Sequence, residues 1–102
     1  MYPTFRQYNS RLGEKKVYFI KKTGCPPCER LAPMMDKIIE KYREIIKTYT
    51  LDTAYDPSIY QKYNVDATPT TLFVYNNRIV GKVEGADVKS ILYYYDQLAR
   101  MQ

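Results

Sequence analysis

The sequence predicts an α/β fold, a three-layer α/β/α sandwich built on a mixed sheet of about four strands. Two observations lead to this prediction. Segments with the periodicity of strands alternate with segments of helical periodicity, which is typical of parallel strands joined by right-handed crossovers. Near the end of the chain, two apolar segments flank an Asn-Asn pair, which indicates an antiparallel hairpin. The length of 102 residues, without linkers or repeats, corresponds to a single domain over residues 1–102.

The first part of the chain predicts a short helix and then a buried strand. Phe5, Tyr8 and Leu12 share one side of a helix over residues 3–12. Lys16–Ile20 is rich in β-branched and aromatic residues, which favour a buried strand. This strand is expected to end before the cysteines that follow it.

A long amphipathic helix is predicted after this strand. Pro26 and Pro27 suit the first turn of a helix, where the N–H that proline lacks would have no partner. Apolar side chains then recur at spacings of three and four, which predicts about five helical turns with a kink at Pro33. The apolar positions are Leu31, Met34, Met35, Ile38, Ile39, Tyr42, Ile45 and Ile46.

Shorter elements are expected in the middle of the chain. Lys47–Leu51 alternates in polarity, which predicts a second strand. Pro57–Tyr63 predicts a short helix, for which Asp56 is the expected N-cap. Asp66–Pro69 is expected to form a loop.

The last third of the chain predicts a hairpin and a closing helix. Thr70–Tyr75 and Arg78–Val83 are the expected strands, and Asn76-Asn77 between them tolerates the positive φ of a tight turn. Gly85 is expected to end the sheet. An amphipathic helix follows, with its apolar side at Val88, Ile91, Leu92, Tyr95 and Leu98.

The composition argues against several classes of protein. Apolar runs such as Val17–Ile20 are far shorter than the roughly 20 residues of a membrane span. The first residues also lack the apolar core of a signal peptide, so we expect no membrane contact and a cytoplasmic location. The net charge of +5 arises from lysines and arginines spread along the chain, which favours an acidic protein partner over nucleic acid.

The 2 cysteines, Cys25 and Cys28, carry the strongest chemical signal in the sequence. They follow a strand and open a helix, whose N-terminal partial charge and free N–H groups favour a thiolate. The thiolate is the form that attacks a disulfide. A second thiol one helical turn further on can then displace the mixed disulfide. The pattern predicts thiol–disulfide exchange, with Cys25 attacking and Cys28 resolving.

Zinc binding and a structural crosslink are the alternative roles for this pair. Zinc would need two further ligands, and the chain has no His and no third Cys, so we expect no metal and no cofactor. A structural crosslink is disfavoured because a disulfide that closes so short a loop restrains the unfolded chain very little.

The ionisation of Cys25 is expected to be shifted only moderately. The helix N-terminus lowers the pKa of its thiol. Pro26 and Pro27 have no N–H, however, so only the amide of Cys28 remains to donate to the sulfur. We therefore expect a pKa below that of a free thiol and well above that of the strongest dithiol oxidants, which is typical of a reductant.

Three segments of the chain, in order and at the right spacing, resemble the thioredoxin family. Gly24–Pro33 resembles the active-site helix, Ala67–Thr70 resembles the cis-proline loop, and Gly85 matches the glycine before the last helix. The resemblance covers residues 15–101 and implies a monomeric enzyme that reduces protein disulfides. Its partners would be these protein disulfide substrates and an upstream reductase or small thiol that donates the electrons.

The resemblance also implies roles for individual residues. Cys25 would be the exposed nucleophile, Cys28 the shielded resolving thiol, and Pro69 a cis proline. An extended segment of the substrate would dock on Gly24, Pro26, Thr68, Pro69, Gly85 and Ala86.

The chain departs from the family pattern at several positions. Thioredoxins usually have Trp where Gly24 stands and a buried Asp where Phe19 stands. Their buried Lys corresponds to about Thr48, and their first edge strand is expected to be missing here. Proton transfer to and from Cys28 is therefore expected to lack its usual carboxylate.

Two other functions compete with this one. Glutaredoxins share the Cys-Pro-x-Cys motif and a Thr-rich cis-proline loop, but their adjacent acidic pair is represented only by the separated Glu84 and Asp87. A thioredoxin-fold interaction module would bind a partner in the same groove without exchange chemistry. The presence of both cysteines together with Thr68-Pro69 favours the enzyme.

Overall fold

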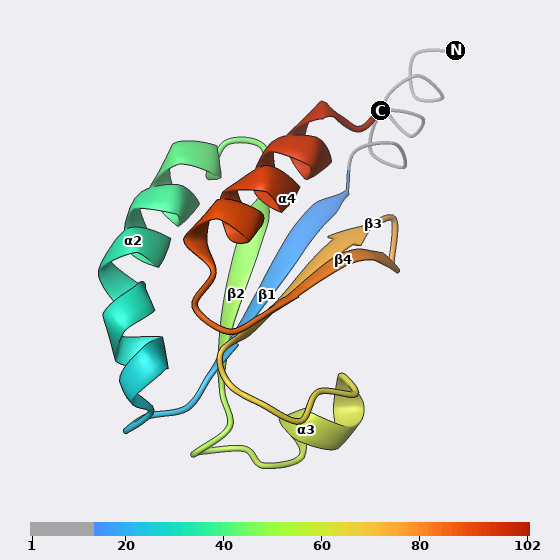
Figure 1. Cartoon of the computed structure of the whole chain (residues 1–102). Helices are drawn as coiled ribbons and strands as arrows, with labels where there is room; N and C mark the ends of the chain where they lie inside the picture. Colours follow the sequence, from blue (N-terminus) through green and yellow to red (C-terminus); the bar gives the residue numbers. More distant parts are fainter. Residues whose placement is uncertain (1–13) are drawn as a thin grey trace.

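The computed structural model describes residues 14–102, and the helix expected over residues 3–12 lies outside them. From the first strand onward, the elements follow the expected order (Figure 1). They are β1 (Lys15–Lys21), α2 (Pro26–Tyr42), β2 (Lys47–Asp52), α3 (Ile59–Lys62), β3 (Thr70–Tyr75), β4 (Arg78–Glu84) and α4 (Val88–Arg100). Within residues 14–102, no helix has the length and apolar character needed to cross a membrane.

A single sheet with the strand order β2-β1-β3-β4 contains the 4 strands of residues 14–102. β1 and β2 are parallel, as expected for strands joined through α2, whereas β3 is antiparallel to both β1 and β4. The predicted mixed sheet is therefore confirmed. The register places Ile20 opposite Thr70, so the end of β1 and the start of β3 lie side by side. The segments that carry the cysteines and Pro69 consequently meet at one end of the sheet.

Two apolar clusters pack against the two faces of the sheet. The larger one lies between the sheet and the helices α2 and α4 (Figure 1). Its buried members are Val17, Phe19, Leu31, Met35, Ile38, Tyr42, Ile46, Phe73, Val83, Ile91, Tyr95 and Leu98. The smaller one includes α3 and consists of Ile20, Ile59, Val65 and Leu72. Together they form the core of the predicted three-layer sandwich.

The helix α2 has 17 residues, close to the five turns predicted, but it ends short of its apolar pattern. It ends at Tyr42, and the chain then turns before β2. Ile46 lies beyond the helix and is still buried, whereas Ile45 is 53% exposed. Met34, inside the helix, is 42% exposed. At Ile45 and Met34, helical spacing of apolar side chains therefore did not predict burial.

The helix α3 is shorter than predicted, and Asp56 is not its N-cap. The N-cap is Ser58, whose side chain caps no amide. The carboxylate of Asp56 accepts instead from the N–H and the hydroxyl of Ser58, at 3.2 and 2.5 Å. An aspartate that bonds the backbone two residues ahead forms a turn, and this turn precedes the helix.

The turn between β3 and β4 has the predicted conformation. Asn76 and Asn77 have φ angles of 51° and 67°, the left-handed values that a tight hairpin of this kind requires. Further along β4, a Cβ on Gly81 would lie 2.5 Å from the ring of Tyr94. The close approach of α4 to the sheet therefore requires a glycine at this position.

Phe19 is buried in the core at the position where the resemblance implied a carboxylate. It is 4% exposed and lies opposite Thr50 on β2 and Thr71 on β3. The hydroxyl of Thr71 is buried and has no hydrogen-bond partner among residues 14–102. Thr48, the position that corresponds to the family's buried Lys, lies two residues before Thr50 on β2. Its hydroxyl shares a 2.7 Å hydrogen bond with Tyr95, whose pKa is raised to about 12 by burial.

Candidate active site

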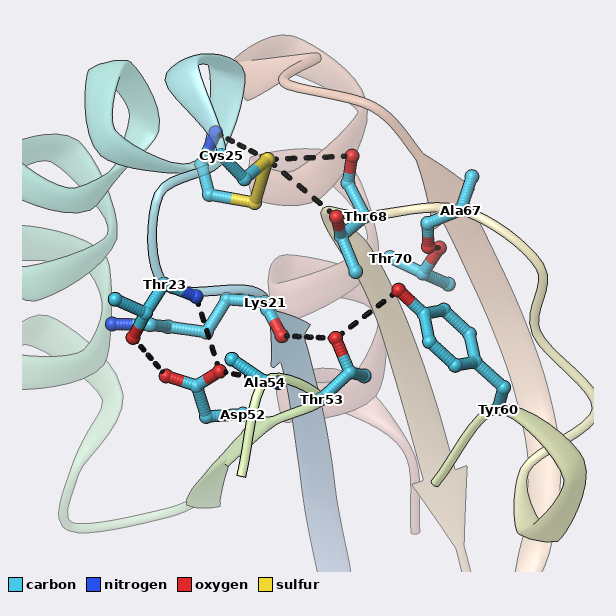
Figure 2. The surroundings of a disulfide bond; sticks show 11 residues. Lys21, Thr23, Cys25, Asp52, Thr53, Ala54, Tyr60, Ala67, Thr68 and Thr70 are labelled. Carbon is cyan, nitrogen blue, oxygen red and sulfur yellow. Dashed lines mark hydrogen bonds between the residues drawn. A yellow bond between two sulfur atoms is a disulfide. The ribbon is translucent and has the colours of Figure 1, made fainter. Parts of the chain in front are cut away.

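Cys25 and Cys28 are joined in a disulfide at the N-terminus of α2, with their Cα atoms 5.2 Å apart (Figure 2). Cys25 is the N-cap of the helix, and Pro26 and Pro27 occupy the first two helical positions. The amide of Cys28 donates to the Sγ of Cys25 at 3.3 Å. Since the two prolines have no N–H, this amide is the donor that the first turn offers to the sulfur, as the sequence predicted.

The two sulfur atoms differ in their access to solvent. Cys28 is 3% exposed, whereas Cys25 is half-buried. Gly24, directly before Cys25, is exposed and has a φ of +88°, a left-handed conformation that other residues adopt only under strain. The chain therefore turns sharply into the helix directly before Cys25, the more exposed of the two cysteines.

The proline loop between α3 and β3 lies against Cys25 (Figure 2). The Thr68–Pro69 peptide bond is cis, as expected. The hydroxyl of Thr68 donates to the Sγ of Cys25 at 3.5 Å, and the carbonyl oxygen of Thr68 lies 3.7 Å from the same sulfur. The hydroxyl of Thr70 closes the loop with a 2.7 Å bond to the carbonyl of Ala67.

The contact of the Thr68 hydroxyl with the sulfur was not predicted. The resemblance implied only that Thr68 belongs to the docking surface, because the side chain of a loop residue can point in any direction until the loop is packed. The hydroxyl is a second donor to Cys25, beside the amide of Cys28. Hydrogen bonds to a thiolate favour the charged form, so in the reduced protein we expect this contact to compensate for part of what the two prolines remove.

The remaining predicted docking residues are distributed around this loop. The N–H of Gly85 donates to the carbonyl of Pro69 at 2.8 Å, so the segment after β4 is attached to the proline loop. Ala86 and Pro26 are both exposed, next to Gly85 and Cys25 in the chain. The structure brings Cys25, Thr68, Pro69 and Gly85 into one network of contacts, while Gly24, Pro26 and Ala86 are exposed residues adjacent to it.

A carboxylate that the sequence analysis did not single out holds the loop before Cys25 (Figure 2). Asp52, at the end of β2, accepts from the hydroxyl and the N–H of Thr23 at 2.5 and 3.1 Å. It also accepts from the N–H of Ala54 at 2.9 Å. Aspartate after a strand is an ordinary turn residue, and only the strand register shows that Thr23 lies beside it.

These contacts also affect the ionisation of Asp52. The bond from the Thr23 hydroxyl is the main cause of a pKa below the usual value, assisted by the amides of Ala54 and Thr23 and opposed by partial desolvation. The carboxylate is therefore charged at neutral pH. Its contribution to stability is present above the pKa of an unfolded aspartate and is lost as the pH falls through the lowered value.

A cavity of about 120 Å³ lies beside Cys28. Its lining consists of Lys21, Lys22, Thr23, Cys28, Glu29 and Ala32. A space of this size has room for water. Lys21, Lys22 and Glu29 are the charged residues of this lining. None of them takes the core position of Phe19, where a carboxylate was expected from the resemblance.

The arrangement can exchange two electrons through the sulfur pair. An accessible sulfur at a helix N-terminus, two donors directed at it and a shielded second sulfur are the components that thiol–disulfide exchange requires. Within residues 14–102, no three side chains of His, Cys, Asp or Glu form a group that could hold a metal ion.

Comparison with known proteins is consistent with this chemistry. The family model "Thioredoxin" matches residues 2–96. Thioredoxin-1 of Saccharomyces cerevisiae is 33% identical over 92 residues, which cover 88% of this chain and 88% of the yeast protein. The chloroplastic M-type thioredoxin of Pisum sativum is 37% identical over 68 residues, which cover 67% of this chain and 40% of that protein. The solved structure of the germline-specific thioredoxin Deadhead of Drosophila melanogaster matches with a TM-score of 0.79 at 20% identity, covering 96% of this chain and 93% of that one.

Proposed function

Because the chain belongs to the thioredoxin family and is a protein thiol–disulfide oxidoreductase, we propose that it acts as a reductase, with Cys25 as nucleophile and Cys28 as resolving thiol. The observation that carries the assignment of roles is the difference in exposure: Cys25 is half-buried and Cys28 is 3% exposed. An exposed thiolate can reach a sulfur atom of another protein, and a shielded one can reach only the sulfur that lies next to it.

The reaction follows from this geometry in two displacements. The thiolate of Cys25 attacks one sulfur of the substrate disulfide, whose S–S bond breaks as a mixed disulfide forms. The substrate sulfur that leaves takes a proton from solvent. Cys28 then loses its proton to water, and its thiolate attacks the Sγ of Cys25. The second substrate thiol is released, two electrons have passed to the substrate, and the Cys25–Cys28 disulfide remains.

Docking of the substrate is assigned to the backbone around the proline loop, where Gly24, Pro26 and Ala86 are exposed, Thr68 and Gly85 are half-buried and Pro69 is buried. The proposed surface consists of Gly24, Pro26, Thr68, Pro69, Gly85 and Ala86. In support, Thr68 and Gly85 are attached to Cys25 and Pro69 by the contacts described above, so backbone groups on both sides of the sulfur have a defined position. An extended segment held mainly by main-chain hydrogen bonds gives broad specificity.

Reduction of insulin by dithiothreitol tests the reductase directly. We expect the protein to accelerate the reaction in catalytic amounts, because Cys25 attacks a docked disulfide and dithiothreitol reduces the resulting Cys25–Cys28 bond. The measurement is the onset of precipitation of the insulin B chain with and without the protein. A rate equal to that of dithiothreitol alone would instead favour the interaction module, in which exchange chemistry has no role.

The Thr68 hydroxyl gives a prediction about the reactivity of Cys25. Thr68→Val keeps the shape of the side chain and removes the donor at 3.5 Å from the sulfur, so it should raise the pKa of the Cys25 thiol. Insulin reduction at neutral pH should then slow several-fold, because less of the thiol is ionised. The ultraviolet absorbance of the thiolate, followed against pH in the reduced protein, measures the change. Thr68→Ser, which keeps the hydroxyl, serves as the control, and an unchanged titration in Thr68→Val would show that the contact has no influence.

The electron donor, the location and the oligomeric state of the enzyme complete the proposal. We assign the electrons to an upstream reductase or a small thiol, and the protein to the cytoplasm as a single-domain monomer over residues 1–102. The moderate depression expected for the Cys25 pKa supports a reductant rather than an oxidant. The relatives of this chain include chloroplastic thioredoxins, so microscopy of a tagged chain is the direct test of location. Sedimentation analysis measures the oligomeric state.

A further inference from the structure

We propose that Asp52 and Thr23 form a clamp that positions Cys25 for attack, a role beyond that of the cysteines and the proline loop. The inference rests on the proposed reductase function and concerns the same site. Both residues lie outside the Cys-x-x-Cys and Thr-Pro motifs, on segments that are 29 positions apart in the chain. Neither touches a sulfur atom, so their role is one of positioning.

The clamp is the main attachment of the segment between β1 and Cys25. Thr23 and Gly24 are exposed, and a Cβ on Gly24 would meet nothing within 4 Å, so packing does not restrain this turn. Cys25 itself has one backbone bond to the turn, from its N–H to the carbonyl of Lys22 at 3.0 Å. The two bonds from Thr23 to the Asp52 carboxylate, at 2.5 and 3.1 Å, fix the turn to the end of β2.

The end of β2 is in turn a rigid support. Thr53, 3% exposed, bonds the carbonyl of Lys21 through both its N–H at 2.9 Å and its hydroxyl at 3.3 Å. The same hydroxyl lies 3.1 Å from the hydroxyl of Tyr60 on α3 (Figure 2). Bonds that involve a charged carboxylate are about twice as strong as neutral ones, so Asp52 is the strongest link in this connection.

The consequence for the chemistry lies in the position of the sulfur. The Sγ of Cys25 must stay near the Thr68 hydroxyl, 3.5 Å away, to receive its second donor. Thr23 lies only two positions before Cys25, so a turn released from Asp52 can shift the sulfur relative to the proline loop. Displacements of about 1 Å are known to slow enzymatic reactions by as much as 100-fold. The clamp therefore sets both the ionisation of Cys25 and its alignment with a docked disulfide.

The chain offers matched variants that separate positioning from stability. Thr23→Val removes the hydroxyl without a change of charge, and Thr23→Ser restores it. Asp52→Ala removes the acceptor of both bonds. Asp56 provides the control, because its carboxylate accepts from the N–H and hydroxyl of Ser58 at the same distances to within 0.1 Å, yet away from the cysteines. Asp56→Ala therefore reproduces the loss of the hydroxyl and amide bonds without touching the turn, while Asp52→Ala also removes the bond from Ala54.

Two measurements on these variants test the clamp. The first is the thiolate titration of Cys25 in the reduced protein, which needs no substrate; the second is kcat/KM for insulin reduction. We expect Thr23→Val to raise the pKa of the Cys25 thiol, and both Thr23→Val and Asp52→Ala to lower kcat/KM about tenfold. Thr23→Ser and Asp56→Ala should match the wild type in both measurements.

Several outcomes would overturn the proposal. One is that Thr23→Val has the same thiolate titration and the same kcat/KM as the wild type. The contact would then be merely structural, even if the midpoint of thermal unfolding falls. Another is an equal loss of activity in Asp56→Ala. Failure of the proposed reductase function is a different result. The wild type itself would then not accelerate insulin reduction, while its thiolate titration would remain measurable.

Discussion

Replacement of Cys28 by serine is expected to leave Cys25 covalently bound to its protein substrates. The first displacement needs only the Cys25 thiolate, whereas release of the substrate needs the buried thiol beside it. The variant should therefore accumulate mixed disulfides. Catalytic reduction of insulin should fall to the rate without protein, which makes this the largest functional effect that we predict.

Non-reducing gel electrophoresis measures the captured species after incubation with oxidised protein substrates. Cys25→Ser is the matched variant, because it retains a cysteine that is 3% exposed and should capture nothing. Treatment with dithiothreitol should release the adducts of Cys28→Ser, which identifies them as disulfides. Equal capture by the two variants would show that the roles of nucleophile and resolving thiol are not divided as proposed.

Phe19→Asp is expected to have the largest effect on stability. The change restores the residue type that thioredoxins have at this position, but here it removes a ring that is 4% exposed in the main core cluster. Loss of a buried phenylalanine alone costs about 3–5 kcal/mol, and burial of a carboxylate adds to this. Thr71, one of the two threonines opposite Phe19 in the register, has a buried hydroxyl without a partner among residues 14–102 that could bond a neutral carboxyl.

The destabilisation of Phe19→Asp should depend on pH. Burial raises the pKa of the new carboxyl above its unfolded value of about 3.9, so the folded state tolerates the neutral form better. The loss of stability is therefore smallest below that value and grows as the pH rises through the raised pKa of the folded state. Denaturant unfolding at several pH values measures it. Phe19→Leu, an apolar control with a smaller side chain, should lose the same stability at every pH, and a pH-independent loss in Phe19→Asp would contradict the argument.

Much of the fold was predictable because its elements depend on local preferences. The strands around Val17 and Leu72, the hairpin turn at Asn76-Asn77 and the start of α2 at Pro26 agree with the structure. Periodicity, positive-φ preference and the lack of a proline N–H act within a few residues, so the sequence alone reveals them. The ends of elements were less accurate, because α2 stops at Tyr42 although apolar residues continue at helical spacing.

The active site, too, was predictable from the sequence only in part. The sequence by itself determined the chemistry, since a Cys-x-x-Cys pair at a helix N-terminus and a Thr-Pro segment before a strand are recognisable motifs. It also determined that prolines would leave Cys25 a single amide donor in the first turn, which the structure shows as the 3.3 Å bond from Cys28.

Only the tertiary structure decided what surrounds the sulfur. The Thr68 hydroxyl reaches Cys25 across 43 positions, and Asp52 reaches Thr23 across 29. Such contacts depend on which strands pair, in which register, and on the direction of side chains in loops, none of which is a property of a short segment. The register also places Phe19 opposite Thr71. The apolar ring of Phe19 is therefore buried where the family pattern has a carboxylate. The type of reaction was thus encoded locally, while the ionisation and alignment of its nucleophile depend on residues that only the folded chain brings together.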